Sequence, residues 1–499
     1  MKKIFEIIPF FLFTIPLFLI VHIENVYQNH IIYKFVKSEI IELFAASLII
    51  AGIFFLLVRN LHRACVYALP VILIFYFFCD LKDSLYNWND KIFISKYAFL
   101  LPTIIILLLL IFRWIRKSKS DFRKLFLFVN VTFVFFIFYE VTGIAISDIL
   151  GNRKNQSKHS INSDNYISCD SCVHPDIYYF VFDAYTSSRV LQSEFNYNNA
   201  HLDSFLKRKH FYIVANSRSN YNLTPFSIGS TLNFDYLQGL NTKKAYYLND
   251  YLPGVSIVNE NKLIPILRKE GYEIFNHSIF KFKDFPSTIP AFDLWELNLV
   301  YERHNIFKNI DKDIGWLIRR YLHFTKIQND DNFTYEIERD KHFTNTVTAL
   351  LQTIKSKNKS PKFTYGHLLL PHKPYTYDHA GNKIPFTRKK MTIAEDKNAY
   401  INQLRFTNKI VDTLVQSILL YAKKPSIIIL QSDHGYKYFD DRKKDLEFAN
   451  LNAIYFYNQN YKLLNDSLSN VNTFRVVLNT FFKKRYPLLK DTSYFLQYK

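Results

Sequence analysis

The sequence is poor in cysteine, with only 4 in 499 residues. Cys65 and Cys79 lie in a long apolar run, where a free cysteine behaves as a small buried hydrophobe. Cys169 and Cys172 form one C-x-x-C, and no second pair is present to complete a zinc site. A redox pair and a local disulfide in an oxidising compartment are the interpretations left for this motif.

The sequence also lacks a signal-peptide cleavage site, internal repeats and long low-complexity tracts. Its first apolar run follows Lys2 and Lys3 but ends without the small residues of a cleavage site, so we expect it to be retained. Four more apolar runs follow, each near the roughly 20 residues that cross a bilayer. The five predicted spans, of which the third is the shortest, are residues 4–22, 41–59, 64–80, 97–114 and 124–146.

Basic residues near the spans predict their orientation, because such residues tend to stay cytoplasmic. Lys2 and Lys3 precede the first span, Arg59 and Arg63 follow the second, and a basic stretch at 113–124 follows the fourth. With five spans all three clusters lie on one side of the membrane. The sequence therefore predicts a multi-pass protein of the cytoplasmic membrane, with a cytoplasmic N-terminus and an extracytoplasmic domain after the last span.

Acidic residues are outnumbered, 43 against 63 Lys and Arg, which gives a net charge of +20. Only about +5 of this charge falls in the first 150 residues, so the rest of the chain is strongly basic. A basic surface outside the membrane suits anionic lipid head groups or phosphate-bearing polymers. The predicted location argues against nucleic acid as a partner.

Beyond the spans, short apolar runs alternate with amphipathic stretches. This alternation predicts an α/β domain whose mostly parallel sheet is covered on both faces. The predicted strands are 176–183, 211–217, 272–278, 362–370, 425–433 and 451–457. The predicted helices are 201–210, 261–270, 343–357, 399–422 and 472–482. The chain is thus divided into a membrane domain (1–147), a linker (148–174) and a C-terminal domain (175–499).

Polar residues stand at the ends of several predicted strands, the edge where parallel sheets gather functional groups. Asp183 ends the run "YYFVFD", and it fits either an N-cap for a helix starting near Thr186 or a metal ligand. Asp433 and His434 are consecutive and would face opposite sides of a continuing strand. They reach one ion only if the chain turns there, and Gly435 is the residue that permits the turn.

Thr224 begins the segment "TPFSI", which predicts a helix start with a proline in the first turn. Its hydroxyl fits two roles. It could cap the helix, or it could lie where a helix N-terminus attracts phosphate and act as a nucleophile beside a metal. The residues alone leave both roles open.

The segment "GHLLLPHKPY" places His367 and His372 on either side of a strand end. Prolines flank His372 in a rigid turn, from which its ring could hydrogen-bond a substrate oxygen. Together the candidate side chains offer one ion three oxygen ligands and one nitrogen ligand, which favours manganese or magnesium, with zinc as the alternative. This predicted ligand set is Asp183, Thr224, Asp433 and His434.

The order of these motifs resembles that of the alkaline phosphatase and sulfatase superfamily. The motifs are a strand-end aspartate, a threonine at a helix start, an H-x-P-Y turn and a late strand that runs into "SDHG". With five spans ahead of them, the chain resembles the membrane-anchored branch that includes lipoteichoic acid synthases and phosphoethanolamine transferases. The resembling motifs span about 175–460. The resemblance implies a helical membrane domain followed by an α/β sulfatase-like domain.

The resemblance also implies a role for each candidate residue. Asp183, Asp433 and His434 match the metal ligands. Thr224 matches the nucleophile that carries a covalent phospho-group and touches the metal. His372 matches the histidine that contacts the substrate phosphate or the leaving group, and His367 lies close enough in sequence to assist it.

Three departures from the superfamily narrow the expected chemistry. Sulfatases carry Cys or Ser in C/S-x-P-S-R, whereas "TPFSI" has Thr224 and no arginine, so sulfate ester hydrolysis is not expected. Two-metal members have a second carboxylate and further histidines, but here Ala184 follows Asp183 and no histidine follows His434, which favours one ion. Lipoteichoic acid synthase-like members have a glutamate where this chain has Asp183.

The expected function is transfer of a phospho-group from a phosphodiester, such as a membrane phospholipid head group, to an envelope glycan or lipid. A covalent phospho-Thr224 would be the intermediate. The alternatives are a phosphodiesterase or phosphatase with water as acceptor, and a catalytically inactive relative that binds an envelope component. The substrate pocket is expected to draw on residues 276–282 and 291–345.

Overall fold

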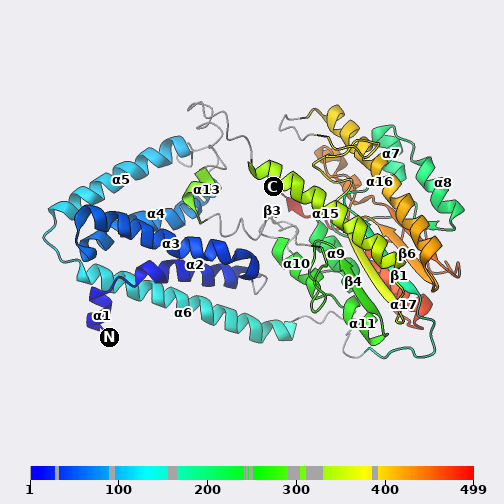
Figure 1. Ribbon diagram of the computed structural model, residues 1–499, viewed down its shortest axis with the longest axis horizontal. Helices are drawn as coiled ribbons and strands as arrows, with labels where there is room; N and C mark the ends of the chain where they lie inside the picture. Colours follow the sequence, from blue (N-terminus) through cyan, green and yellow to red (C-terminus); the bar gives the residue numbers. More distant parts are fainter. Residues whose placement is uncertain are drawn as a thin grey trace. The chain divides into compact units, whose positions relative to one another are not determined.

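The computed structural model divides into two compact units (Figure 1). The first comprises Met1–Asn155 and Asp293–Gln328, and the second comprises Gln156–Phe292 and Asn329–Lys499. The predicted C-terminal domain, 175–499, includes residues 293–328, which belong to the first of these units. The domain boundaries therefore stay a prediction. The structure describes residues 2–27, 33–88, 96–154, 166–240, 242, 245–246, 251–289, 304–310, 330–384 and 391–498. Most of the predicted pocket segment 291–345 lies outside these residues.

The first unit is helical. Its described helices are α1 (Lys2–Ile7), α2 (Phe11–Tyr27), α3 (Tyr33–Val58), α4 (Leu61–Trp88), α5 (Tyr97–Lys117), α6 (Arg123–Lys154) and α13 (Ile306–Ile310). Within the described residues, four are long and apolar enough to cross a membrane: Ile40–Val58, Leu61–Leu85, Tyr97–Lys117 and Arg123–Ile146. The first predicted span is a shorter apolar helix, Phe11–Ile23. The prediction that the third span is the shortest is wrong, since it covers 25 residues.

Two polar side chains of α6 hold the N-terminal helices. The amide of Asn130 donates to the carbonyl of Ile8 at 2.8 Å and accepts from the backbone of Phe11 at 2.9 Å, which bridges the break between α1 and α2. Glu140 bonds His22 at 2.8 Å and accepts from Asn25 at 2.5 Å. Each buried polar group of α6 therefore has partners, as an apolar surrounding requires.

The second unit is built on a 6-stranded sheet in the order β2-β7-β6-β1-β5-β4. Its strands are β1 (Asp176–Phe182), β2 (Tyr212–Ile213), β4 (Glu273–His277), β5 (Lys362–Leu368), β6 (Ser426–Gln431) and β7 (Asn452–Phe456). Strands β6, β1, β5 and β4 are parallel, and β7 runs antiparallel to both β6 and β2. A separate pair joins β3 (Ala245–Tyr246) to β8 (Gln497–Tyr498). This confirms the predicted α/β class with a mostly parallel sheet.

Helices cover both faces of the sheet, as Figure 1 shows. Alternate residues of β1 enter opposite cores, as strand geometry requires: Tyr179 faces one, and Tyr178 and Phe180 face the other. The first core is closed by α9 (Thr224–Asn233), α10 (Leu252–Asn259), α11 (Leu263–Lys269) and α17 (Thr473–Phe481). The second is closed by α7 (Ser188–Phe195), α8 (Ala200–Arg208), α15 (Asp330–Lys355) and α16 (Ile393–Tyr421).

Some local predictions are wrong. The sequence predicts a fully buried strand over 211–217, but β2 has only two residues, both half-buried, which pair with Ala453 and Ile454 of β7. The helix predicted at 343–357 begins at Asp330, and the short β3 and β8 were not predicted. Asp183 does not cap the helix after β1, because Ser187 is the N-cap of α7 and accepts from the backbone of Val190.

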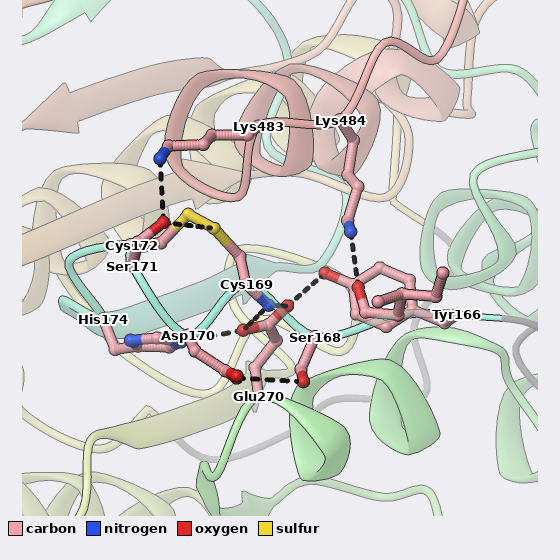
Figure 2. The surroundings of a disulfide bond; sticks show 11 residues. Tyr166, Ser168, Cys169, Asp170, Ser171, Cys172, His174, Glu270, Lys483 and Lys484 are labelled. Atoms are coloured by element: carbon pink, nitrogen blue, oxygen red, sulfur yellow. Dashed lines mark hydrogen bonds and ion pairs between the residues drawn. A yellow bond between two sulfur atoms is a disulfide. The ribbon is translucent and has the colours of Figure 1, made fainter.

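The C-x-x-C segment lies on the surface of the second unit, where Cys169 and Cys172 form a disulfide (Figure 2). The buried carboxylate of Glu270 accepts from the Tyr166 hydroxyl at 2.6 Å and the Cys169 backbone at 3.1 Å. It also bonds His174 Nε2 at 2.7 Å. The segment is thus anchored immediately before β1, and its two cysteines are bonded, as the interpretation as a local disulfide predicts.

Candidate active site

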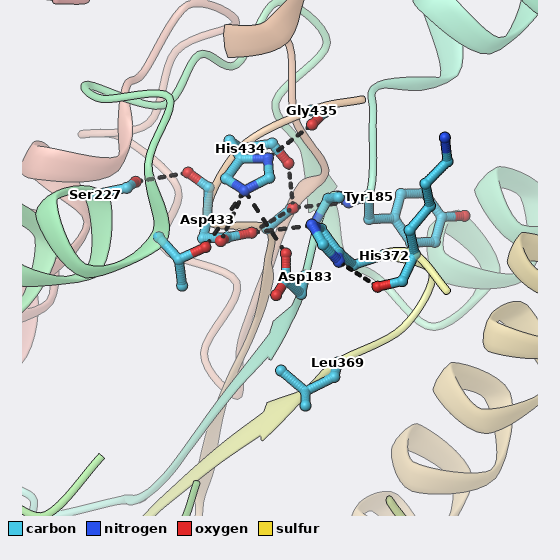
Figure 3. Close-up of polar contacts among 12 residues, drawn as sticks. Asp183, Tyr185, Ser227, Leu369, His372, Asp433, His434 and Gly435 are labelled. Carbon is cyan, nitrogen blue, oxygen red and sulfur yellow. Dashed lines mark hydrogen bonds and ion pairs between the residues drawn. The ribbon is translucent and has the colours of Figure 1, made fainter. Parts of the chain in front are cut away.

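The carboxyl ends of β1 and β6 bring two aspartates together. The register pairs Val181 of β1 with Gln431 of β6, and Asp183 and Asp433 each come two residues later. The chain leaves β6 after Gln431, so His434 is no longer bound to strand geometry. Figure 3 shows Asp183, Asp433 and His434 pointing toward one another. The predicted convergence of these side chains is what the structure shows.

Distances within this group suit a shared ion. His434 Nε2 lies 3.3 Å from Asp433 Oδ2 and 3.6 Å from Asp183 Oδ1. One ligand atom from each residue lies within 4.8 Å of the others, and all three residues are buried. Asp183 Oδ1 and Asp433 Oδ2 accept no hydrogen bond from the described part of the chain. Two buried carboxylate oxygens without donors are costly unless a cation lies between them.

Hydrogen bonding fixes the form of His434 that a metal needs. Its Nδ1 lies 2.7 Å from the carbonyl of Gly435, which can only accept, so Nδ1 carries the proton. Nε2 then presents its lone pair to the aspartates, in the arrangement of a metal-ligating histidine. The residues therefore fit the implied divalent ion, with Asp183, Asp433 and His434 as its holders.

Burial and the closeness of the two carboxylates dominate the electrostatics of this group. Burial and the neighbouring Asp433 raise the pKa of Asp183 well above its usual value. Burial also works to raise the pKa of Asp433, but His434, His367 and the Thr224 hydroxyl outweigh it and lower the pKa to about 2. Burial lowers the pKa of His434 to about 4, against the opposing effect of Asp433. A neutral imidazole beside one ionised carboxylate is ready to bind a cation.

Thr224 is the first residue of α9, and its hydroxyl does not cap that helix. Leu223 is the N-cap residue, and no side chain makes the capping bond. The Thr224 Oγ1 instead lies 3.3 Å from His434 Nε2. Ser227, in the first turn of α9, donates to the carbonyl of Asp433 at 2.5 Å, which ties the helix to the aspartate loop. The hydroxyl therefore lies both at a helix N-terminus and beside the His434 ring.

Gly435 is needed for a different reason from the one predicted. Its φ is not among the positive values of the described residues. A Cβ at this position would lie 2.3 Å from the carbonyl oxygen of Ala449 and 3.1 Å from the Thr186 hydroxyl. The glycine lets the loop after His434 pack against neighbouring backbone.

His372 lies near His434, and His367 lies near Asp183. The rings of His372 and His434 are 6.3 Å apart, and His372 Nδ1 bonds the carbonyl of Lys373 at 2.6 Å, so Nε2 is free of its proton in the neutral ring. Burial, then Lys437 and other cations, lower the pKa of His372 to about 3. His367 Nε2 is 4.0 Å from Asp183 Oδ2.

Two basic residues near the site were not predicted. Burial lowers the pKa of Lys437, while Asp183 and Asp433 oppose this shift. Arg339 donates to the carbonyls of Leu369 and His372 at 2.5 and 2.7 Å and so fixes the His372 turn. The segment Tyr436 to Asp440 gave no sequence signal beyond its closeness to "SDHG".

Comparison with known families agrees with this geometry. A sulfatase family model matches residues 197–477, more than half of the 499 residues. The chain belongs to the sulfatase family. The match includes Thr224, His372, Asp433 and His434 and begins after Asp183. No curated protein sequence matches this sulfatase-family chain.

Several solved structures are distantly similar to this sulfatase-family chain. The lipooligosaccharide phosphoethanolamine transferase EptA from Neisseria meningitidis has 13% identity over 92% of this chain and 94% of its own, with a TM-score of 0.40. The periplasmic domain of EptC from Escherichia coli has 13% identity over 65% of this chain and 90% of its own, with a TM-score of 0.40. A phosphonate monoester hydrolase of Agrobacterium radiobacter has 11% identity over 61% and 73%, with a TM-score of 0.36. These scores are too low to argue for a substrate.

Proposed function

We propose that the chain is a metal-dependent transferase that moves a phospho-group from a phosphodiester through a covalent phospho-Thr224. The observation that carries this proposal is the position of the Thr224 hydroxyl, 3.3 Å from His434 Nε2 and at the N-terminus of α9. Backbone N–H groups at a helix N-terminus favour phosphate oxygens. A threonine in place of the cysteine or serine of sulfatases supports phosphate rather than sulfate esters.

The proposed residues act in two displacements. The Thr224 hydroxyl first releases its proton to solvent. Thr224 Oγ1 then attacks phosphorus, the bond from phosphorus to the leaving alcohol breaks, and His372 donates a proton to the departing oxygen. An acceptor hydroxyl then attacks phosphorus, the bond to Thr224 Oγ1 breaks, and His372 takes the acceptor's proton. An anionic phosphodiester beside His372 favours its protonated form at the start. A divalent ion held by Asp183, Asp433 and His434 would supply a lower pKa for the Thr224 hydroxyl and positive charge for the phosphoryl oxygens.

Location and charge support a lipid donor. Apolar helices would keep the site near membrane phospholipid, which raises the effective donor concentration. The disulfide Cys169–Cys172 fits an oxidising compartment, as the proposed cytoplasmic N-terminus and extracytoplasmic second unit require. The basic composition suits anionic envelope components. We therefore propose a phospholipid head group as donor and an envelope glycan or lipid as acceptor.

Trapping the intermediate tests the proposal. The purified full chain with phospholipid and Mn²⁺, Mg²⁺ or Zn²⁺ is expected to carry a phospho-group on Thr224, visible by peptide mass spectrometry. Thr224→Ala should abolish it. Thr231→Ala is the matched control, because Thr231 lies in the same helix but donates to the carbonyl of Ser227 at 2.9 Å.

Acceptor identity follows from the turnover of the trapped species. Added sugar or lipid should accelerate its loss if the chain is a transferase, whereas equal loss in water alone would indicate a phosphodiesterase. Envelope mass spectrometry of cells carrying Thr224→Ala should then show one component without its phospho-substituent. A chain that never labels and a Thr224→Ala strain without any phenotype would indicate an inactive relative.

A further inference from the structure

The Asp396 carboxylate binds side chains from two different loops. It lies in the first turn of α16 and is only 5% exposed. Its Oδ2 accepts from the Tyr375 hydroxyl at 3.2 Å and from the Tyr436 hydroxyl in a shorter contact. Its Oδ1 forms an ion pair with the ammonium of Lys373. One buried carboxylate thus has three partners, none of them on its own helix.

These partners flank the candidate catalytic groups. Lys373 and Tyr375 belong to the turn that begins at His372, and Tyr436 comes two residues after His434. The ammonium of Lys373 also lies 3.7 Å from the ring centre of Tyr438, a cation–π contact between the same two loops. Asp396 therefore joins the loop that carries His372 to the loop that carries the metal-binding pair.

The same face of α16 supports the site further along the helix. Tyr400, one turn after Asp396, donates to the carbonyl of Ala184 at 2.8 Å, next to Asp183. Gln403, almost two turns after Asp396, donates to the carbonyl of His372 at 2.9 Å. Residues spaced by about one and two turns share a helix face. Tyr400 and Gln403 hold backbone, whereas only Asp396 of the three gathers side chains from both loops.

We propose that Asp396 is a positioning residue for phosphotransfer. It sets the separation of His372 from the Asp433–His434 pair and does not touch substrate. A displacement of about 1 Å in such a group costs about 10²-fold in rate. The inference rests on the proposed function, because its readout is phosphotransfer.

The first measurement uses the full chain in detergent with Asp396→Asn, which keeps the side-chain shape but removes the charge that holds Lys373. We expect kcat to fall about 10²-fold while KM changes little, since substrate contacts are intact. Asp340→Asn is the matched control and should leave kcat within about threefold. Asp340 also accepts from a tyrosine hydroxyl, that of Tyr377, and pairs with Lys383 at 2.6 Å; these described contacts do not involve the Tyr436 loop.

A double-mutant cycle with His372→Ala tests whether Asp396 acts through His372. If Asp396 acts through His372, Asp396→Asn should cost less than about threefold in the His372→Ala background. An undiminished cost there would overturn the positioning role and leave the proposed function intact. A His372→Ala variant with normal turnover would overturn both.

A second pair of variants covers the case in which Asp396→Asn fails to fold. Tyr375→Phe and Tyr436→Phe each remove one hydroxyl donor and keep the ring. Each is expected to lower kcat roughly tenfold, the equivalent of about one hydrogen bond, with the melting temperature nearly unchanged. Normal kcat in both folded variants would overturn the inference.

Discussion

Strand β1 carries a buried aspartate at its amino end and another just past its carboxyl end, and the two have opposite surroundings. Asp176 accepts from the backbone of Lys362 at 3.0 Å, and although burial raises its pKa, Lys362 opposes the shift. Asp183 has an oxygen without a donor among the described residues and faces a second carboxylate, which raises its pKa further. They are 4% and 6% exposed, so burial does not distinguish them.

The different surroundings of Asp176 and Asp183 indicate that one end of the strand serves the fold and the other serves the candidate site. At the amino end, the buried charge is compensated by the chain itself, as a stable core requires. At the carboxyl end the chain leaves charge uncompensated, which lowers the stability of the metal-free fold and creates an affinity for a cation. Buried charges that lower stability persist at functional sites, where the binding of a ligand offsets their cost.

Neutralising each aspartate in turn should have the largest and most different effects. Asp183→Asn should reduce phosphotransfer about 10⁴-fold, yet raise the unfolding free energy of the metal-free chain by about 1–2 kcal/mol. Asp176→Asn should do the reverse, with activity within about threefold and a loss of about 1–2 kcal/mol. Turnover assays and thermal unfolding in chelator measure both. Equal effects on stability would show that the two ends do not differ.

Lys437 tests whether the carboxyl end also uses charge supplied by the chain. Burial lowers the pKa of Lys437 and the two aspartates oppose this shift, so we expect its ammonium to supply positive charge for a phosphoryl oxygen. Lys437→Met should lower kcat about 10²-fold. Lys443→Met, which removes an exposed partner of Glu194, is the control. A rate unchanged by Lys437→Met would assign that lysine to the fold alone.

Metal binding should stabilise only a chain whose carboxyl end is intact. At a metal concentration of 100 times Kd, the unfolding free energy should rise by about 2.7 kcal/mol in the unmodified chain and in Asp176→Asn. Asp183→Asn and His434→Gln should lose this increase. Thermal unfolding with Mn²⁺, Mg²⁺ and Zn²⁺ in parallel ranks the ions. Retention of the increase in Asp183→Asn would exclude that residue as a ligand.

The smallest expected effect is on stability, and it comes from a histidine at the carboxyl edge of the sheet. Both nitrogens of its ring are hydrogen-bonded. His277 ends β4 and bonds Thr288 at 2.6 Å and Thr353 at 2.8 Å, and burial lowers its pKa to about 4. The unfolded chain, with a histidine pKa near 6.5, then binds more protons between pH 6.5 and 4. Stability should therefore fall as pH falls through this range, on the order of 2 kcal/mol from His277. In His277→Gln, unfolding measured with chelator present should depend less on pH; an unchanged pH dependence would contradict the assignment.

Prediction from sequence succeeded where local pattern and chain order were sufficient. Buried apolar runs marked β1, β5 and β6, and parallel strands put their following residues at one edge, so Asp183 and Asp433 could be expected to meet. It failed where a contact depends on distant residues. The exclusion of a Cβ at Gly435 comes from the Ala449 carbonyl, and β2 pairs with only two residues of β7, Ala453 and Ile454.

The sequence by itself determined the apolar helices and the α/β class, because both follow from periodicity, and its short motifs singled out Thr224 and the candidate ligands. Only the tertiary structure decided that Thr224 turns its hydroxyl to His434 instead of capping α9. It alone also placed the Asp396 carboxylate between two loops. Hydrogen bonds and charge act through space, and no spacing along the chain encodes a partner that folding supplies from another element.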